Sequence, residues 1–212
     1  GEPVSPSEFI PLAEETGLID DLSWIVLEEV CMLLGQMRDK IDSISINLSM
    51  QQFEDRSLCA RIHECLNRSG LNPDQLKIEV TERVLLQDMD YMKMMMEEMT
   101  GEGFGFYLDD FGTGYSNISC ALSLPFEYIK LDRSLLVRLP GDSKVQVFVR
   151  SMVETFHAMG QKIVAEGVEE EEQIELLRQF GVDCVQGYYY GKPMPEDEFR
   201  AAVAKGWEEQ RR

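Results

Sequence analysis

The sequence predicts an α/β protein built as an incomplete (β/α)8 barrel. Short β-branched and apolar runs alternate with amphipathic stretches along the chain, as expected of a parallel sheet with helices packed outside it. Polar side chains end nearly every apolar run, and in a barrel the carboxyl ends of all strands meet on one face. Neither G-x-G-x-x-G nor G-x-x-x-x-G-K-[ST], the phosphate loops that would favour an open doubly wound sheet, occurs.

The predicted elements begin with two helices ahead of the first strand, at Ser7–Thr16 and Asp20–Met37. Six strands are predicted, at Ser43–Asn47, Leu76–Val80, Phe104–Leu108, Tyr128–Leu131, Lys162–Ala165 and Asp183–Val185. Amphipathic helices are predicted between them, at Leu58–Arg68, Asp88–Thr100, Val145–Met159 and Glu170–Phe180. Closure of a barrel needs eight strands, so two elements are missing from the count, and the leading helices place that gap at the amino end. No Pro/Ser-rich linker divides the chain, so we expect residues 1–212 to form one domain.

Composition excludes several classes of function. The formal net charge of −19 opposes binding to polymeric nucleic acid, which depends on clustered Lys and Arg. No apolar run approaches the roughly 20 residues of a membrane span, and the amino terminus lacks a secretory profile, so we expect a cytoplasmic domain without membrane contact. The absence of Cys-x-x-Cys spacing argues against a disulfide framework or a zinc knuckle and favours buried thiols in a reducing compartment. The five cysteines are Cys31, Cys59, Cys65, Cys120 and Cys184.

The polar residues at the strand ends predict a metal site. Carboxylate and amide oxygens that face one pocket repel each other unless cations neutralise them, and such ligands suit Mg2+ or Mn2+. Asp109 and Asp110 are adjacent after an apolar strand, so their side chains should diverge, one of them toward a second metal position. Two ions close together would favour in-line displacement at phosphorus, and Lys130 would hold the attacking water or offset phosphate charge. The predicted oxygen ligands are Asn47, Glu79, Asp109, Asp110 and Glu166.

Each of these residues also has an ordinary structural interpretation. A strand-end Asn commonly caps the next helix, a strand-terminal Glu is often only the first solvated residue, and Lys130 would pair with Asp132 at the surface. The two histidines, His63 and His157, lie in predicted helices away from the strand ends, and we expect ordinary surface or capping roles for them. Only the recurrence of polar residues after successive apolar strands favours a shared function.

Six motifs resemble, in order and spacing, those of the EAL domain family of bacterial cyclic-di-GMP-specific phosphodiesterases. The opening segment Val4–Glu14 resembles the stretch that follows the EAL strand of that family. The motifs are Ile46-Asn47-Leu48-Ser49, Glu79-Val80-Thr81-Glu82, Asp109-Asp110-Phe111-Gly112-Thr113-Gly114-Tyr115-Ser116, Ile129-Lys130-Leu131-Asp132-Arg133-Ser134, Ala165-Glu166-Gly167-Val168-Glu169 and Val185-Gln186-Gly187-Tyr188.

The resemblance implies a TIM-like barrel that hydrolyses cyclic di-GMP to pGpG with two Mg2+ or Mn2+ ions. Asn47, Glu79 and Asp109 match the family's metal ligands, and Asp110 and Glu166 match ligands or water-holding groups near the second metal. Lys130 and Glu166 match the residues that position and deprotonate the attacking water. Glu82 matches the acid that steadies the Asp-Asp-Phe-Gly loop, Glu169 matches an acid that lies beside the metal or supports its ligands, and Gln186 matches a further polar residue of the site. That loop lies near the family's dimer interface, so we expect a homodimer.

The sequence lacks the Glu-Ala-Leu tripeptide, whose Glu is a metal ligand in the family. We therefore expect a domain truncated at its amino end, which alone would bind metal weakly and turn over little substrate. Its uncovered sheet edges favour a homodimer or swapped oligomer, and a GGDEF or sensor domain is expected in the parent protein. A non-catalytic cyclic-di-GMP receptor and a general metal phosphatase remain alternative interpretations.

Overall fold

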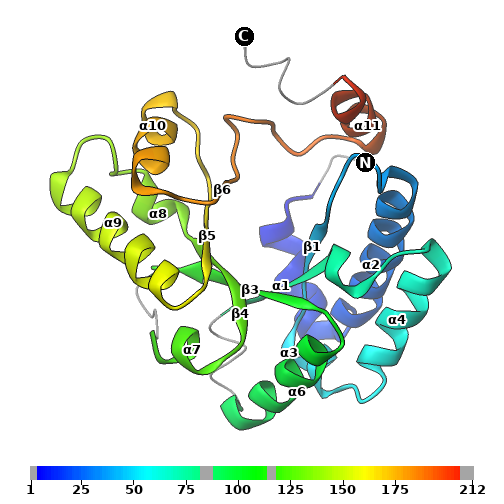
Figure 1. The fold of residues 1–212 in the computed structure, drawn as a ribbon. Helices are drawn as coiled ribbons and strands as arrows, with labels where there is room; N and C mark the ends of the chain where they lie inside the picture. The colour runs from blue at the N-terminus through cyan, green and yellow to red at the C-terminus, as the bar shows by residue number, and fades with distance from the viewer. Residues whose placement is uncertain (1–3, 82–87, 114–117, 206–212) are drawn as a thin grey trace.

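The described part of the chain forms one curled, parallel sheet. The computed structural model describes residues 4–81, 88–113 and 118–205. Within these ranges six strands pair in chain order, and each strand is parallel to its neighbour. The sheet curls as half of a barrel (Figure 1), which confirms the predicted incomplete barrel. The strands are β1 (Ile44–Asn47), β2 (Leu76–Thr81), β3 (Gly105–Phe111), β4 (Phe126–Leu131), β5 (Lys162–Ala165) and β6 (Cys184–Val185).

The helices lie mainly around the outer side of this sheet (Figure 1). The longer ones agree with the predicted helices to within two residues at each end. They are α1 (Pro6–Thr16), α2 (Ile19–Met37), α4 (Leu58–Ser69), α6 (Met89–Gly101), α9 (Ser143–Ala158) and α10 (Glu171–Phe180). The structure adds short elements that the sequence pattern does not predict, together with a helix near the carboxyl end. These are α3 (Met50–Glu54), the 3-10 turn η1 (Pro73–Gln75), α7 (Ile118–Ser123), α8 (Arg133–Leu136) and α11 (Glu196–Ala204).

Helix ends follow local capping chemistry. The Asp142 carboxylate accepts hydrogen bonds from the first backbone N–H groups of α9. Glu170 and Gln173 form a capping box at the start of α10, and Gly181 ends that helix in the left-handed conformation at φ 81°. These residues explain why α9 begins, and α10 begins and ends, close to the predicted positions.

The outer face of the sheet packs against the helices and forms the core. Ile78, Phe106 and Ile129, from three neighbouring strands, are fully buried. Met92, Met96 and Met99 follow helical spacing on α6 and are also fully buried. The methionine-rich stretch therefore packs a helix against the sheet.

The inner face is polar and carries aromatic rings. Alternate residues of a strand point to opposite faces, so the neighbours of the buried residues project inward. The Lys77 ammonium on β2 lies 2.8 Å from the Glu127 carboxylate on β4. Tyr107 and Tyr128 are paired residues of β3 and β4, and their ring centroids are 4.5 Å apart. The inner face thus presents groups that can interact with a polar ligand.

The carboxyl-terminal helix α11 lies beside α2 (Figure 1), and the Arg200 guanidinium donates to the Gln36 side chain at 2.6 Å. This contact joins α11 to the carboxyl end of α2. In the ranges that the structure describes, no helix is both long enough and apolar enough to span a bilayer.

Candidate active site

A buried lysine connects the carboxyl ends of three strands. Lys130, the fifth residue of β4, has a side chain only 4% exposed. Its ammonium lies 2.6 Å from the Glu79 carboxylate on β2 and 2.8 Å from Asp109 on β3. The Glu166 carboxylate, directly after β5, is also 2.8 Å away. The sequence brings together residues up to 87 positions apart because parallel strands place their carboxyl ends at one edge.

The alternative pairing of Lys130 with Asp132 at the surface is wrong. Asp132 is instead the N-cap of α8, where its carboxylate accepts a hydrogen bond from the Ser134 backbone N–H at 2.8 Å. Lys130 points inward because Ile129 and Leu131, on either side of it, are fully buried in the core.

Asn47 joins the same group from β1. Its side-chain amide donates to the Glu79 carboxylate at 3.3 Å, and that same carboxylate oxygen accepts from Lys130. The simple helix-capping interpretation of Asn47 does not apply, because Ser49 is the N-cap of α3. Four strands and the segment after β5 therefore contribute to one network.

A β-bulge brings both aspartates of β3 to this network. Between Leu108 and Phe111 the strand carries one residue more than its partner β4, and Asp110 has a φ of 58°. In a regular strand adjacent side chains point to opposite faces. The left-handed residue turns Asp110 back, so Asp109, Asp110 and Glu166 each offer an oxygen within 4.8 Å of the others. The sequence predicts that the side chains of Asp109 and Asp110 diverge, whereas in the structure one carboxylate oxygen of each lies close to Glu166.

The electrostatics of the network reflect an excess of negative charge. Burial raises the pKa of Glu166 from its ordinary 4.5 to about 7, and the neighbouring Lys130 offsets only part of this rise. Burial and the adjacent Asp109 carboxylate raise the pKa of Asp110. Burial alone would lower the pKa of Lys130, but Glu79, Asp109 and Glu166 outweigh it and raise that pKa, which keeps the ammonium charged.

The donor set fits divalent cations. Three carboxylates contact one ammonium, Asp110 adds a fourth carboxylate beside Asp109 and Glu166, and all of the ligand atoms are oxygens, which Mg2+ and Mn2+ prefer. Oδ1 of Asp109 is buried and has no hydrogen bond of good geometry, although Lys130 Nζ lies 2.8 Å from it. A buried carboxylate oxygen without a proper donor is available for a metal ion.

Two glycines allow the segments after β5 and β6 to pack closely. The backbone N–H of Val168 donates to the Gln186 carbonyl at 3.1 Å. A Cβ at Gly187 would lie 2.2 Å from the Val168 carbonyl oxygen, which is too close for any side chain. Gly167 has a φ of 64° and lies against the Arg133 side chain. These contacts hold the backbone that follows Glu166.

The remaining predicted site residues lie at the margin of the network. Glu169 forms an ion pair with Arg133 at 2.9 Å, outside the group around Lys130. Gln186 is exposed, and its backbone N–H extends the sheet by donating to the Ala165 carbonyl at 2.8 Å. Glu82 lies outside the described residues. Arg133, which supports Glu169 and Gly167, is not predicted as a site residue, because its only signal in the sequence is its position within the Lys130 motif.

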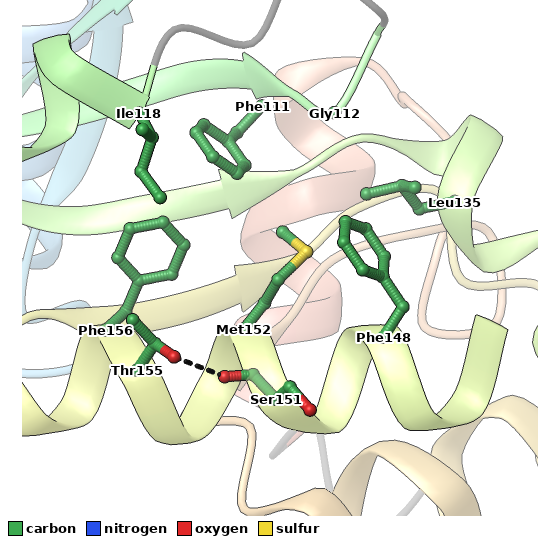
Figure 2. A pocket seen from close by; sticks show the side chains of 9 residues that line it. All are labelled: Phe111, Gly112, Ile118, Leu135, Phe148, Ser151, Met152, Thr155 and Phe156. Atoms are coloured by element: carbon green, nitrogen blue, oxygen red, sulfur yellow. Dashed lines mark hydrogen bonds between the residues drawn. The ribbon is translucent and has the colours of Figure 1, made fainter. Parts of the chain in front are cut away.

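An apolar cavity of about 460 Å³ lies beside the bulge, on the helical side of β3. Figure 2 shows Phe111 and Ile118 above α9, whose Thr155 hydroxyl donates to the Ser151 carbonyl at 2.7 Å. The cavity is separate from the carboxylate network, since Phe111 points to the core while the aspartates point inward. Its lining consists of Phe111, Gly112, Ile118, Leu135, Phe148, Ser151, Met152, Thr155 and Phe156.

Comparison with known proteins gives one consistent family. The sequence model described as "EAL domain" matches residues 1–193. MucR of Pseudomonas aeruginosa, described as a bifunctional diguanylate cyclase/cyclic di-GMP phosphodiesterase, is 38% identical over 207 residues, which are 95% of this chain and 30% of MucR. The chain spans about a quarter to a third of the length of the curated relatives it matches.

Solved structures agree with this result. The PaMucR phosphodiesterase in complex with c-di-GMP has a TM-score of 0.84 and 37% identity, over 92% of this chain and 81% of that one. Klebsiella pneumoniae BlrP1, in a complex with manganese and c-di-GMP, has a TM-score of 0.77 and 27% identity, over 83% of this chain and 45% of that one. The same fold in those proteins therefore accompanies c-di-GMP and, in BlrP1, a divalent metal.

Proposed function

This chain belongs to the EAL domain family, and we propose that it is the catalytic domain of a cyclic-di-GMP phosphodiesterase, producing linear pGpG. The observation that carries the proposal is the buried Lys130 ammonium held among Glu79, Asp109 and Glu166 at the carboxyl edge of the sheet. The likeness to MucR and to the c-di-GMP complex of PaMucR supports the choice of substrate.

We propose that two Mg2+ or Mn2+ ions bind the oxygen ligands Asn47, Glu79, Asp109, Asp110 and Glu166. When bound, the ions supply positive charge to the phosphate and to the attacking water. The excess of carboxylates over ammonium groups and the buried Asp109 oxygen without a proper donor support this assignment. The manganese in the BlrP1 complex is consistent with it.

The chain's own residues would carry the proton and orient the water. We propose that Glu166, whose carboxylate lies 2.8 Å from Lys130 at the carboxyl edge of the sheet, accepts the proton of the attacking water. The water oxygen bonds to phosphorus, the bond from phosphorus to one ribose 3′ oxygen breaks, and that oxygen takes a proton from solvent. Lys130 stays protonated and positions the water or a phosphate oxygen.

Residues around this group would hold it in place. We propose that Glu169 acts through Arg133, which lies against Gly167 next to Glu166. We propose that Gln186, an exposed residue directly after β6, contacts the substrate. Glu82 keeps the role that the resemblance gives it, support of the Asp-Asp-Phe-Gly loop.

The test is to incubate the purified chain with cyclic di-GMP and Mg2+ or Mn2+ and to measure pGpG by chromatography. We expect product from wild type, a loss of at least 100-fold in Glu166→Gln, and little change in Glu172→Gln, an exposed acid in the first turn of α10. Because the sequence lacks the Glu of the EAL tripeptide, we expect slow turnover that increases in a chain extended at its amino end by native residues. Binding of cyclic di-GMP without turnover by the extended chain would favour a receptor, and comparable activity on simple phosphate esters would favour a general phosphatase.

We propose a homodimer whose interface includes the rim of the apolar cavity. Ile118 and Phe148 line this cavity, and each is 53% exposed. Light scattering of Phe148→Asp should show a shift from dimer to monomer. Val147→Asp, at a neighbouring exposed position of α9 outside the cavity lining, serves as the matched control.

We also propose that the domain works in the cytoplasm and joins a GGDEF or sensor domain in the parent protein. Free thiols at Cys31, Cys59, Cys65 and Cys184 are consistent with a reducing compartment. The relatives it matches are three to four times longer than the chain, which leaves room for such domains.

A further inference from the structure

A second cluster of metal-binding side chains lies at the opposite end of the sheet from the proposed active site. Glu102 follows α6 and precedes β3, whereas Asp109 and Asp110 lie near the far end of that strand. A strand of this length spans about 20 Å. A metal ion bound by Glu102 therefore cannot be one of the ions of the proposed active site.

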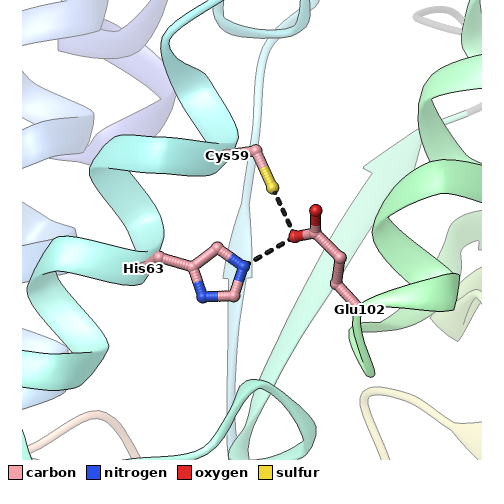
Figure 3. A group of neighbouring side chains, drawn as sticks. All are labelled: Cys59, His63 and Glu102. Carbon is pink, nitrogen blue, oxygen red and sulfur yellow. Dashed lines mark hydrogen bonds and ion pairs between the residues drawn. The ribbon is translucent and has the colours of Figure 1, made fainter.

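The cluster consists of Cys59, His63 and Glu102. Cys59 and His63 are four residues apart on α4, so both lie on one face of that helix. The Cys59 thiol donates to Glu102 Oε2 with a sulfur–oxygen distance of 2.9 Å, and His63 Nε2 lies 2.6 Å from the same oxygen. Figure 3 shows the three side chains converging from two segments of the chain.

The three groups supply a sulfur, an imidazole nitrogen and a carboxylate oxygen, with one atom of each within 4.8 Å of the others. This mixed donor set is typical of Zn2+, whereas Mg2+ and Mn2+ prefer oxygen ligands. We propose that Cys59, His63 and Glu102 form a zinc site, which links α4 to the turn between α6 and β3.

The geometry needs only a small adjustment to accept the ion. Zinc bonds of about 2.3 Å to sulfur and about 2.0 Å to nitrogen and oxygen place tetrahedral ligand atoms about 3.3 to 3.6 Å apart. The hydrogen-bonded contacts of 2.6 and 2.9 Å would therefore open by about 0.7 Å each. His63 and Glu102 side chains are 34% and 39% exposed, so they have room to move and an ion can enter from solvent.

The metal would replace a proton of the metal-free cluster. Burial, and then the Glu102 carboxylate, raise the pKa of Cys59 to about 12, while hydrogen bonds from Cys59 and His63 lower the pKa of Glu102. The metal-free protein therefore holds a neutral thiol beside an ionised carboxylate. Zinc binding forms the thiolate bond and releases the thiol proton to solvent. Three side chains leave the fourth tetrahedral position for water.

Cobalt(II) is the probe, since a cobalt–thiolate bond absorbs in the near ultraviolet and the oxygen-lined active site gives no such band. The full chain is titrated with Co2+ in excess Mg2+, which occupies the oxygen site. We expect a thiolate band that saturates at one equivalent and disappears when Zn2+ is added. Cys59→Ser should abolish the band, and His63→Ala and Glu102→Gln should weaken Co2+ binding at least tenfold.

Cys184→Ser is the matched control, because Cys184 is exposed and lies on β6, and it should keep the full band. Alkylation of wild type, read by mass spectrometry, covers the case in which Cys59→Ser does not fold. Zn2+ should slow alkylation of Cys59 at least tenfold and leave Cys184 unchanged. A missing thiolate band, an undiminished band in Cys59→Ser, or equal protection of both cysteines would overturn the proposal.

Discussion

Replacement of Glu166 by Gln should stabilise the metal-free protein while removing its proposed activity. Gln has nearly the shape of a protonated Glu and carries no charge. The pKa of Glu166 rises from 4.5 to about 7 because the side chain is buried among other acids. At 1.36 kcal/mol per pKa unit, the ionised form is disfavoured in the folded protein by about 3 kcal/mol.

The sign of the effect depends on pH. Between pH 4.5 and about 7 the folded protein binds more protons at Glu166 than the unfolded chain does. The wild-type free energy of unfolding therefore falls as pH rises through this range, and the Gln variant lacks this component. Near pH 4 the two proteins should be equally stable, and at pH 8 the variant should be more stable by about 3 kcal/mol, or roughly 6 to 12 °C in Tm.

The assay is thermal unfolding in EDTA from pH 4 to pH 8, with Glu169→Gln as the control. Glu169 lies three residues away and pairs with Arg133 at the surface, so its loss should change stability by less than about 1 kcal/mol at each pH. Saturating Mn2+ should reverse the order, since ligand binding stabilises the folded form that retains the carboxylate. The reasoning is refuted if Glu166→Gln is less stable in EDTA at pH 8, or if its advantage does not change with pH.

Three further changes test other parts of the site. Lys130→Met leaves three carboxylates without their ammonium and should lower Tm in EDTA by about 10 °C, with partial recovery in Mn2+; an unchanged Tm contradicts the charge argument. Gly187→Ala would force a Cβ against the Val168 backbone and should lower the free energy of unfolding, measured in urea, by at least 2 kcal/mol, about the scale of overpacking. Gly141→Ala, with open space around it, should be neutral, and similar losses in both would refute the packing argument. Asp110→Gly and Asp110→Ala both remove a carboxylate, but Gly tolerates the positive φ, so urea unfolding should show the Gly variant more stable by about 1 kcal/mol; equal stabilities would argue against a left-handed residue there.

The sequence predicts the strands and long helices well because hydrophobic periodicity and capping residues act locally. It also identifies Lys130 and its three carboxylate partners as polar residues after apolar runs. It cannot decide between a surface and a buried lysine, since that depends on which residues the neighbouring strands place beside it. The parallel register, which aligns Lys130 with Val164 of β5, decides that question in the structure.

Two features lie beyond sequence patterns for physical reasons. The residues Asp109 and Asp110 are compatible with a regular strand and with a bulged one, so their sequence does not distinguish the two. The pairing of β3 with β4 produces the bulge. Cys59 and His63 have helical spacing, but Glu102 is 39 residues from His63, and only the packing of α4 against the turn after α6 joins them. The expectation of an ordinary surface role for His63 rests on its helix alone and does not include this neighbour.

The bulge in β3 also reverses the rule by which side chains on this strand can be assigned to a face. Before it, odd-numbered residues such as Tyr107 and Asp109 point inward, whereas after it Phe111 points to the core and packs against Phe156 with ring centroids 5.2 Å apart. Deletion of one aspartate would restore a regular strand and leave Phe111 on the core face opposite Leu131, because the bulge accommodates one extra residue. The bulge therefore lets β3 carry two adjacent aspartates while Phe111 keeps its place in the core, independently of the charges they carry.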